Sequence, residues 1–317
     1  MEVKIQIQNG SRGIEPVVKE NIVWETERKG TPGKLTFSCI NDGNLKVEEG
    51  NPVKLIVDGT PMFYGFVFKV NRDKSKTIDI LCYDQMRYLK NKDTYNFSNT
   101  TANRIIEMVA KDYGITTGEL EETTYLIKSW VAEDKTLFDI MQESLDMTLT
   151  NTRQLFVLYD DVGKLTLKRA QRMAVGLIID SETAETYKYE SNIDEETYNR
   201  VLLVYEDSET KRRSYYKAEG SQTQWGTLQY YEKISNNANA QNKANALLKL
   251  YNTKTKHLTI KNALGDKRVR AGSVILVRLD LGDMKVDNLM LVNKCKHIFK
   301  NNEHFMTLSV IGGEFVG

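Results

Sequence analysis

The chain has 317 residues, 40% of them hydrophobic and 27% charged, so it can build folded cores and is not a disordered polymer. Its formal net charge of +1 at pH 7 supplies no electrostatic case for a nucleic-acid-binding protein. At roughly 100–200 residues per domain, the length predicts two or three domains.

Cysteine usage and hydropathy argue against a disulfide-rich, zinc-binding, secreted or membrane-spanning protein. Cys39, Cys82 and Cys295 lie far apart, each in a strand-like run where a small buried hydrophobe fits, which argues against a disulfide framework or a zinc site. Residues 1–13 lack the apolar region of a signal peptide, and no apolar stretch approaches ~20 residues. We expect a protein made in the bacterial cytoplasm, with no membrane contact.

Residues 1–92 are predicted to form a β-sheet. Residues 3–8 alternate in polarity, and a second alternating run has Ile22 and Trp24 on one side and charged residues toward solvent or a partner. Residues 34–89 continue as strands, with a hairpin at Asp58-Gly59 and a polar turn at 71–76. About six strands are enough to curl into a small barrel.

Residues 93–171 are predicted to form an α+β unit. A connector at 93–97 precedes a helix over 98–114, capped by Asn99, Thr100 or Thr101 and ended by Gly114. After a short strand at 125–130, Asp134 or Thr136 caps a second helix, and a hairpin then turns at residues 160–163.

Residues 172–317 are predicted to return to β-structure. A buried strand at 201–205 and an exposed edge strand at 211–220 come first, and residues 221–235 are expected to be a loop. A third helix spans 237–252, so a helix-bearing insertion at about 215–254 interrupts this sheet.

A weaker copy of the first sheet occurs at 257–310. Leu258-Thr259-Ile260 matches Leu35-Thr36-Phe37, and Val269-Arg270-Ala271-Gly272 matches Val47-Glu48-Glu49-Gly50. Any two antiparallel meanders share part of such a pattern, but the matched order of several strands and two turns favours a duplicated module.

Chemical motifs are few. His297 and Cys295 could share one strand face, but no orienting third group or oxyanion site accompanies them. Asp160-Asp161 fits a hairpin turn better than a metal site, and Glu25 with Glu27 fits an exposed strand better than a glycosidase pair. His257 and His304 occur singly in polar contexts, and we predict no catalytic residue, metal or cofactor.

Sixteen tyrosines cluster in the chain, interleaved with acidic residues as often as with Lys, which favours interfaces and cores over nucleic acid. Two basic clusters, 211–213 and 267–270, are expected to be solvated turns. The candidate interface residues are Trp24, Glu25, Glu27, Arg28, Lys211, Arg212, Arg213, Trp225, Tyr230 and Tyr231.

The segments WETERKGTPGKLTFSC, GFVFKV and ILCYDQMRYLKNKDTYNF resemble the baseplate hub family of contractile phage tails and phage-derived particles. The resemblance is to the hubs of PBSX-type prophages and to late control gene D proteins. The later runs YNRVLLVYE, WGTLQYYEK, NALLKLYN, VRAGSVILV and MTLSVIGGEF extend it over most of the chain.

This resemblance implies a non-enzymatic homotrimer in which each chain carries two tube-like β-barrels, so that a pseudo-six-fold ring joins the six-fold tail tube to the three-fold central spike. The expected partners are the tube, the spike and other baseplate proteins. The barrels would be residues 1–92 and 172–317, with 93–171 to one side. A genome could pass through the ring without sequence-specific contact. The particle, a phage, bacteriocin-like or other injection device, would leave the cell by lysis.

Two alternatives differ in class. One is a tail-tip module that binds a surface glycan through the loops around Trp225 and Tyr230-Tyr231. The other, with less support, is a cell-wall hydrolase.

Overall fold

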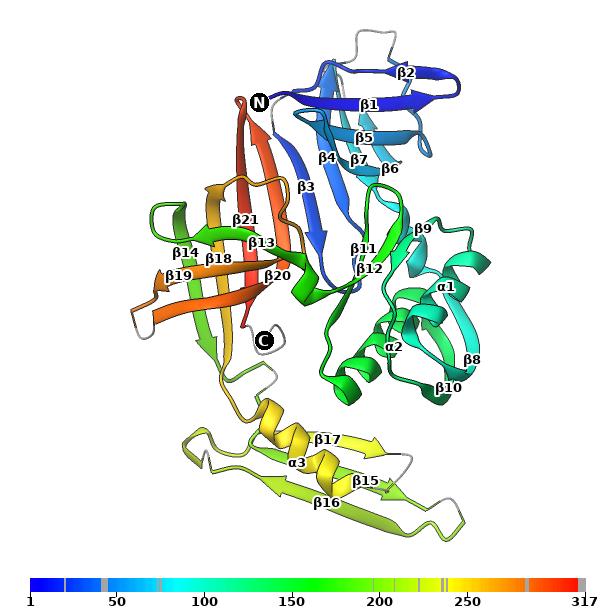
Figure 1. Ribbon diagram of the computed structural model, residues 1–317, viewed down its shortest axis with the longest axis vertical. Helices are drawn as coiled ribbons and strands as arrows, with labels where there is room; N and C mark the ends of the chain where they lie inside the picture. Colours follow the sequence, from blue (N-terminus) through cyan, green and yellow to red (C-terminus); the bar gives the residue numbers. More distant parts are fainter. Residues whose placement is uncertain are drawn as a thin grey trace. The chain divides into compact units, whose positions relative to one another are not determined.

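Strands dominate the structure, which is a computed structural model of the chain (Figure 1). It describes residues 1–312 apart from residues 20, 41–44, 73, 75, 196, 208, 222, 235, 236, 238, 283 and 284. Strands hold 54% of the chain and helices 17%, which confirms the predicted mainly β fold. No helix in the described ranges is long and apolar enough to cross a bilayer.

The first repeat is an antiparallel run ordered β3-β4-β7-β6-β5-β1-β2. Its strands are β1 (Val3–Asn9), β2 (Arg12–Ile14), β3 (Ile22–Glu27), β4 (Lys34–Ile40), β5 (Pro52–Val57), β6 (Thr60–Arg72) and β7 (Thr77–Tyr83). Alternate side chains such as Leu35, Leu55 and Ile80 form its core. The predicted hairpin is confirmed, because Asp58 and Gly59 have φ of 46° and 72° between β5 and β6. The turn predicted at 71–76 includes residues 73 and 75, which lie outside the described residues.

The described strand pairs do not close this repeat into a barrel. The segment after β2 reaches β4 instead through backbone hydrogen bonds, from Lys19 N to Ser38 O at 2.7 Å and from Ile40 N to Val17 O at 2.9 Å. Pro16, which has no N–H, interrupts the strand between β2 and this contact. The repeat is therefore a curled sheet.

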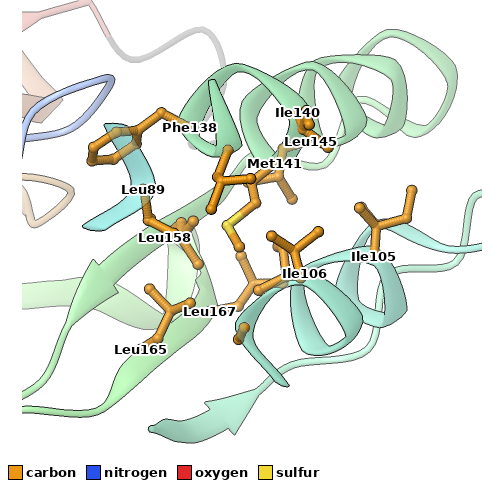
Figure 2. Close-up of a cluster of buried hydrophobic side chains, with 14 of the residues drawn as sticks. Leu89, Ile105, Ile106, Phe138, Ile140, Met141, Leu145, Leu158, Leu165 and Leu167 are labelled. Carbon is orange, nitrogen blue, oxygen red and sulfur yellow. The ribbon is translucent and has the colours of Figure 1, made fainter. Parts of the chain in front are cut away.

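The middle of the chain packs two helices against a hairpin. Its elements are η1 (Gln85–Lys90), β8 (Lys92–Thr100), α1 (Ala102–Asp112), β9 (Thr117–Leu120), β10 (Ile127–Thr136), α2 (Leu137–Thr152), β11 (Phe156–Asp160) and β12 (Leu165–Arg169). Figure 2 shows apolar side chains of α1 and α2 meeting those of β11 and β12. Thr136 caps α2 as predicted, accepting a hydrogen bond from Asp139 N at 3.1 Å.

The connector predicted at 93–97 is wrong, because these residues lie within β8. The short strand predicted at 125–130 is confirmed in part, since β10 begins at Ile127 but continues to Thr136 and pairs with β8. Only one side chain of β8, Phe97, is buried, so its polar composition gives a weak strand signal. The strand forms because β10 supplies hydrogen-bond partners for its backbone, which the local sequence pattern does not predict.

The second repeat has the strand order of the first. It comprises β13 (Ala174–Ile179), β14 (Ala184–Asn192), β18 (Thr255–Leu264), β19 (Val274–Asp280), β20 (Lys285–Lys300) and β21 (Glu303–Ile311), preceded by η2 (Ala170–Met173). Its strands follow the order β14-β18-β21-β20-β19-β13, which corresponds strand by strand to β3-β4-β7-β6-β5-β1 in the first repeat. The last pair differs, since β13 is parallel to β19 whereas β1 is antiparallel to β5.

Details of the two repeats also coincide. Gly50 N and Gly272 N bond to Val67 O and Val292 O, both at 2.8 Å. A register shift follows each of these valines, between Val67 and Lys69 and between Val292 and Lys294. A shared bulge at one position of a shared strand order confirms the sequence repeat as a structural repeat.

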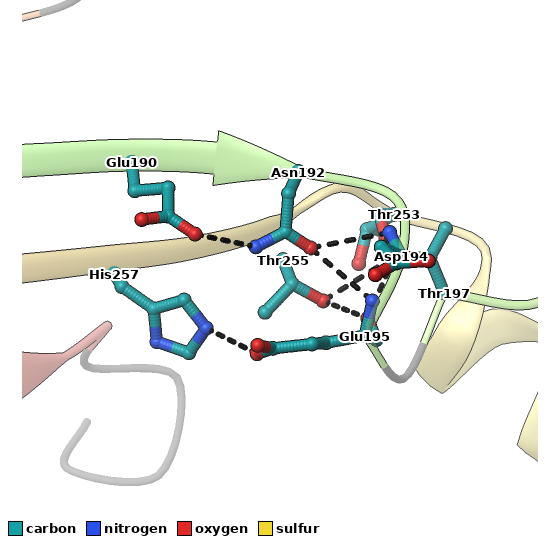
Figure 3. Close-up of polar contacts among 8 residues, drawn as sticks. All are labelled: Glu190, Asn192, Asp194, Glu195, Thr197, Thr253, Thr255 and His257. Atoms are coloured by element: carbon teal, nitrogen blue, oxygen red, sulfur yellow. Dashed lines mark hydrogen bonds and ion pairs between the residues drawn. The ribbon is translucent and has the colours of Figure 1, made fainter.

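Residues Tyr189–Leu258 form a separate compact unit, which contains the predicted insertion. It holds β15 (Arg200–Glu206), β16 (Arg213–Glu219), η3 (Thr223–Trp225), β17 (Gln229–Ile234) and α3 (Ala240–Tyr251). The expected loop at 221–235 is partly wrong, since β17 pairs in parallel with β15. At the base of this unit, His257 bonds to Glu195 at 2.8 Å and Thr197 to Thr253 O at 2.9 Å, which ties the entering and leaving segments together (Figure 3).

The glycines that precede β5 and β19 should differ in how well they tolerate substitution by alanine. Gly50 and Gly272 have φ of +87° and +93°, so alanine at either is strained by about 1–2 kcal/mol. A Cβ at Gly272 would also lie 2.4 Å from Val157 Cγ1, whereas nothing lies within 4 Å at Gly50. We expect Gly272→Ala to cost about 1–3 kcal/mol more than Gly50→Ala in urea unfolding. Equal losses would contradict this packing.

Candidate assembly site at the junction of the two repeats

The two repeats share one sheet because β3 of the first pairs with β20 of the second (Figure 1). The antiparallel register runs from Glu27 opposite Lys294 to Ile22 opposite Phe299. Arg28 extends the contact, with its N bonded to Asn293 O at 3.0 Å and its Nε to Asn293 Oδ1 at 3.3 Å. Backbone hydrogen bonds therefore hold the repeats together.

The side chains on the inner face of this junction are buried. The Trp24 ring stacks on His297 with centroids 4.9 Å apart, and Thr26 Oγ1 accepts a hydrogen bond from Ala271 N at 2.9 Å. Trp24 is only 4% exposed, so its prediction as an interface residue is wrong for its side chain. Its ring belongs to the core because it lies opposite His297 across the paired strands.

The outer face carries alternating charge. Glu25 lies 3.4 Å from both Lys34 and Lys296, and Glu27 lies 3.1 Å from Lys294. These partly exposed pairs each contribute about 0–1 kcal/mol. Because the glutamates all lie on β3 and the lysines opposite them on β20, the opposite charges favour the pairing of these two strands in this register.

His297 is fully buried at the centre of the junction. Its Nε2 lies 2.8 Å from Val269 O and must donate to it, so its Nδ1 accepts from His304 Nε2, also at 2.8 Å. Burial, and then the neighbouring His304, lower the pKa of His297 to about 3, and burial lowers the pKa of His304 to about 4. Both rings are therefore neutral at pH 7. The sequence did not indicate His304, because its partners lie on another strand and in a loop.

Cys295 and His297 do share one strand face, which the sequence left possible, and their Sγ and Nε2 lie 3.2 Å apart. Burial raises the pKa of the Cys295 thiol, while it lowers the pKa of His297. A reactive pair needs the opposite shifts, toward thiolate and imidazolium. The pair is thus part of the core.

Arg270 links the helix-pair region to the second repeat. Its guanidinium lies 4.1 Å from the Tyr159 ring centroid and 6.0 Å from that of Trp24, and its Nη2 donates to Asp160 O at 2.8 Å. The cluster at 267–270 is therefore only partly the solvated turn predicted. Arg268 is exposed and bonded to Asp266, whereas Arg270 is held between two aromatic rings.

Two buried carboxyls lie near this arginine. Asp84 accepts hydrogen bonds from Gly33 N at 2.8 Å and Met86 N at 3.0 Å, and Asp160 accepts one from Gly163 N at 2.7 Å. Burial, and then the Asp160 charge, raise the pKa of Asp84 well above its usual range, and burial also raises that of Asp160. Asp160 thus closes the hairpin turn, as the sequence predicts.

The other candidate interface residues lie in the separate unit 189–258. Lys211 and Arg212 are exposed at the turn between β15 and β16, and Arg213 is exposed at the start of β16. Tyr230 stacks on Tyr251 at 5.5 Å and belongs to the core, whereas Tyr231 is 52% exposed. Trp225 is half-buried in η3.

The fold is that of phage tail proteins. The prophage MuSo2 43 kDa tail protein from Shewanella oneidensis matches with a TM-score of 0.72 and 13% identity, over 99% of this chain and 100% of that one. A tail protein from Neisseria meningitidis MC58 matches with a TM-score of 0.74 and 13% identity, over 100% and 98%. An E. coli protein is described as a type VI secretion component similar to T4 gp27 and gp5. It matches with a TM-score of 0.57 and 11% identity, over 100% of this chain and 78% of that one.

Curated relatives extend over nearly the same length. The chain is 30% identical over 305 residues to the uncharacterized protein YqbQ of Bacillus subtilis strain 168, covering 93% of this chain and 92% of the relative. It is 29% identical to the phage-like element PBSX protein XkdQ of the same strain, covering 93% of each. The YqbQ-like family matches residues 22–311, and the chain belongs to that family.

The buried histidine pair should make stability depend on pH. Because the folded pKa of His297 is about 3, below the ordinary 6.5, unfolding takes up a proton as the pH falls below about 6.5. In His297→Gln, stability at pH 7 falls, but the further loss from pH 7 to pH 5 should shrink by about 1–2 kcal/mol.

The measurement is urea unfolding of variant and wild type at both pH values. Asp84 and Asp160 act with the opposite sign, since their raised pKa values add stability as the pH falls, but this term is common to both proteins and cancels in the difference. Phe299→Leu, at a buried neighbour of His297 that carries no titrating group, is the matched control and should keep the wild-type slope. An unchanged slope in His297→Gln would refute the assignment.

Proposed function

We propose that the chain is a structural component of a phage-like tail, acting as the baseplate hub that joins a six-fold tube to a three-fold spike. The support for a tail role is the YqbQ-like family, the PBSX relative and a fold shared with tail proteins over nearly the whole chain. The particle would assemble in the bacterial cytoplasm and leave by lysis.

The observation that carries the hub proposal is the continuous sheet through two repeats of one strand order. A ring of three such chains presents six similar units, which matches six-fold symmetry on one side and three-fold on the other. Each repeat would then act as one tube-like barrel, near the predicted ranges 1–92 and 172–317, closed by contacts with its neighbours.

The remaining parts fit roles outside the ring. The helix-pair region 93–171 and the unit 189–258 would contact spike or other baseplate proteins. In the latter, the basic turn at Lys211, Arg212 and Arg213 and the exposed Tyr231 are the candidate contacts. Glu25 and Glu27 remain candidates on the outer face of the sheet, and the half-buried Arg28, bonded to Asn293, remains one just after β3.

The purified chain should form a trimer with an axial opening. We expect light scattering to give about three times the chain mass of 36.4 kDa, and electron-microscopy averages to show a three-fold ring with six similar lobes. Edges left unpaired in a monomer favour further association, so aggregates are expected wherever the ring does not form. A stable monomer at high concentration would overturn the proposal.

A further inference from the structure

The internal junction is a template for the contact between chains. Within one chain, β3 of the first repeat receives β20 of the second. If the repeats alternate around a ring, the equivalent contact joins the strand equivalent to β3 in one chain with the strand equivalent to β20 in the next. This inference rests on the proposed ring.

The common strand order identifies both equivalents. β14 occupies the place of β3, next to β18 as β3 is next to β4. β6 occupies the place of β20, and the shared register shift aligns Lys69 with Lys294. Residues 294–299 of β20 lie between β21 and β3, so residues 69–72 of β6 are the matching segment.

Both strands have an edge to offer. Over residues 69–72, β6 pairs with β7, while its pairing with β5 covers only Thr60–Phe66 among the described residues. Asn71 and Arg72 are exposed. β14 is the end strand of the described order, and its side chains are mostly exposed. Long exposed edges of this kind are templates for another chain.

The charge pattern of the internal junction recurs on these strands. There, lysines of β20 face glutamates of β3. β6 carries Lys69 and Arg72, and β14 carries Glu185 and Glu190 with Lys188 between them. We infer that β14 of one chain pairs antiparallel with residues 69–72 of β6 in a second copy, as a head-to-tail contact.

Backbone direction selects a residue for the test. Leu264 N bonds to Thr183 O at 3.1 Å, so the backbone groups of Thr183 face β18. Because these groups alternate along a strand, those of Thr186 face the outer edge. The N–H of Ala184 bonds instead to Asp180 O at 3.2 Å, within the turn before β14. A proline at 186 removes an outward N–H and leaves the β18 side intact, as edge strands tolerate.

The first arm of the experiment compares Thr186→Pro with Thr186→Val by light scattering and circular dichroism. Thr186→Val keeps the N–H and should remain trimeric. Thr186→Pro should keep the β-rich spectrum and lose the trimer, with the dissociation constant of the trimer raised at least about tenfold, about 1.4 kcal/mol. A Thr186→Pro protein as trimeric as wild type would overturn the inference.

The second arm does not depend on the proline variant folding. Asn71→Cys is combined in turn with Thr186→Cys, Lys188→Cys and Glu190→Cys, and a short bismaleimide is added to the full-length protein. The native cysteines are buried, so the new thiols should react selectively. We expect linked dimers and trimers from at least one pair, and none from single variants, because a head-to-tail contact brings two different positions together.

Asn71→Cys with Gln241→Cys, on exposed α3, is the matched control and should not link. A wild-type trimer that links in none of the β14 pairs refutes this contact and leaves the hub proposal standing. A wild-type monomer refutes both.

Discussion

The pairing of β3 with β20 is the constraint on which the rest of the molecule depends. It covers an edge of each repeat with the other, and backbone hydrogen bonds between segments more than 260 residues apart hold the sheet together. The stacked Trp24 and His297 rings fill the space beneath it. Without this contact, both strands would present open edges and the junction core would be exposed.

A buried polar cluster fixes the helix-pair region to that sheet. Arg270 lies between Tyr159, at the end of the β11 strand, and Trp24, while Asp84 holds the backbone at Gly33. Asp160 Oδ2 and Arg270 Nε have no hydrogen-bond partner among the described residues, so burying this cluster is costly. Removing one partner of a buried charged contact costs still more, so the cluster favours one arrangement of the three segments rather than simply adding stability.

Duplication explains why one chain carries two similar edges. The repeats share strand order, the glycine before β5 and β19, and a bulge in β6 and β20. The two repeats differ at positions where other parts of the chain pack against only one of them. A Cβ at Gly272 meets Val157 of the helix-pair region, whereas the same position at Gly50 is open. Each copy thus keeps the common backbone and adapts its surroundings.

The sequence by itself determined the local elements, because alternation, turn residues and caps act over a few positions. The Asp58-Gly59 hairpin, the cap at Thr136 and the turn at Asp160 followed from such signals. Only the tertiary structure decided that β8 is a strand, that Trp24 is buried and that Arg270 and His304 enter the core. Those outcomes depend on partners distant in sequence, and no local pattern encodes the side chain that will lie opposite.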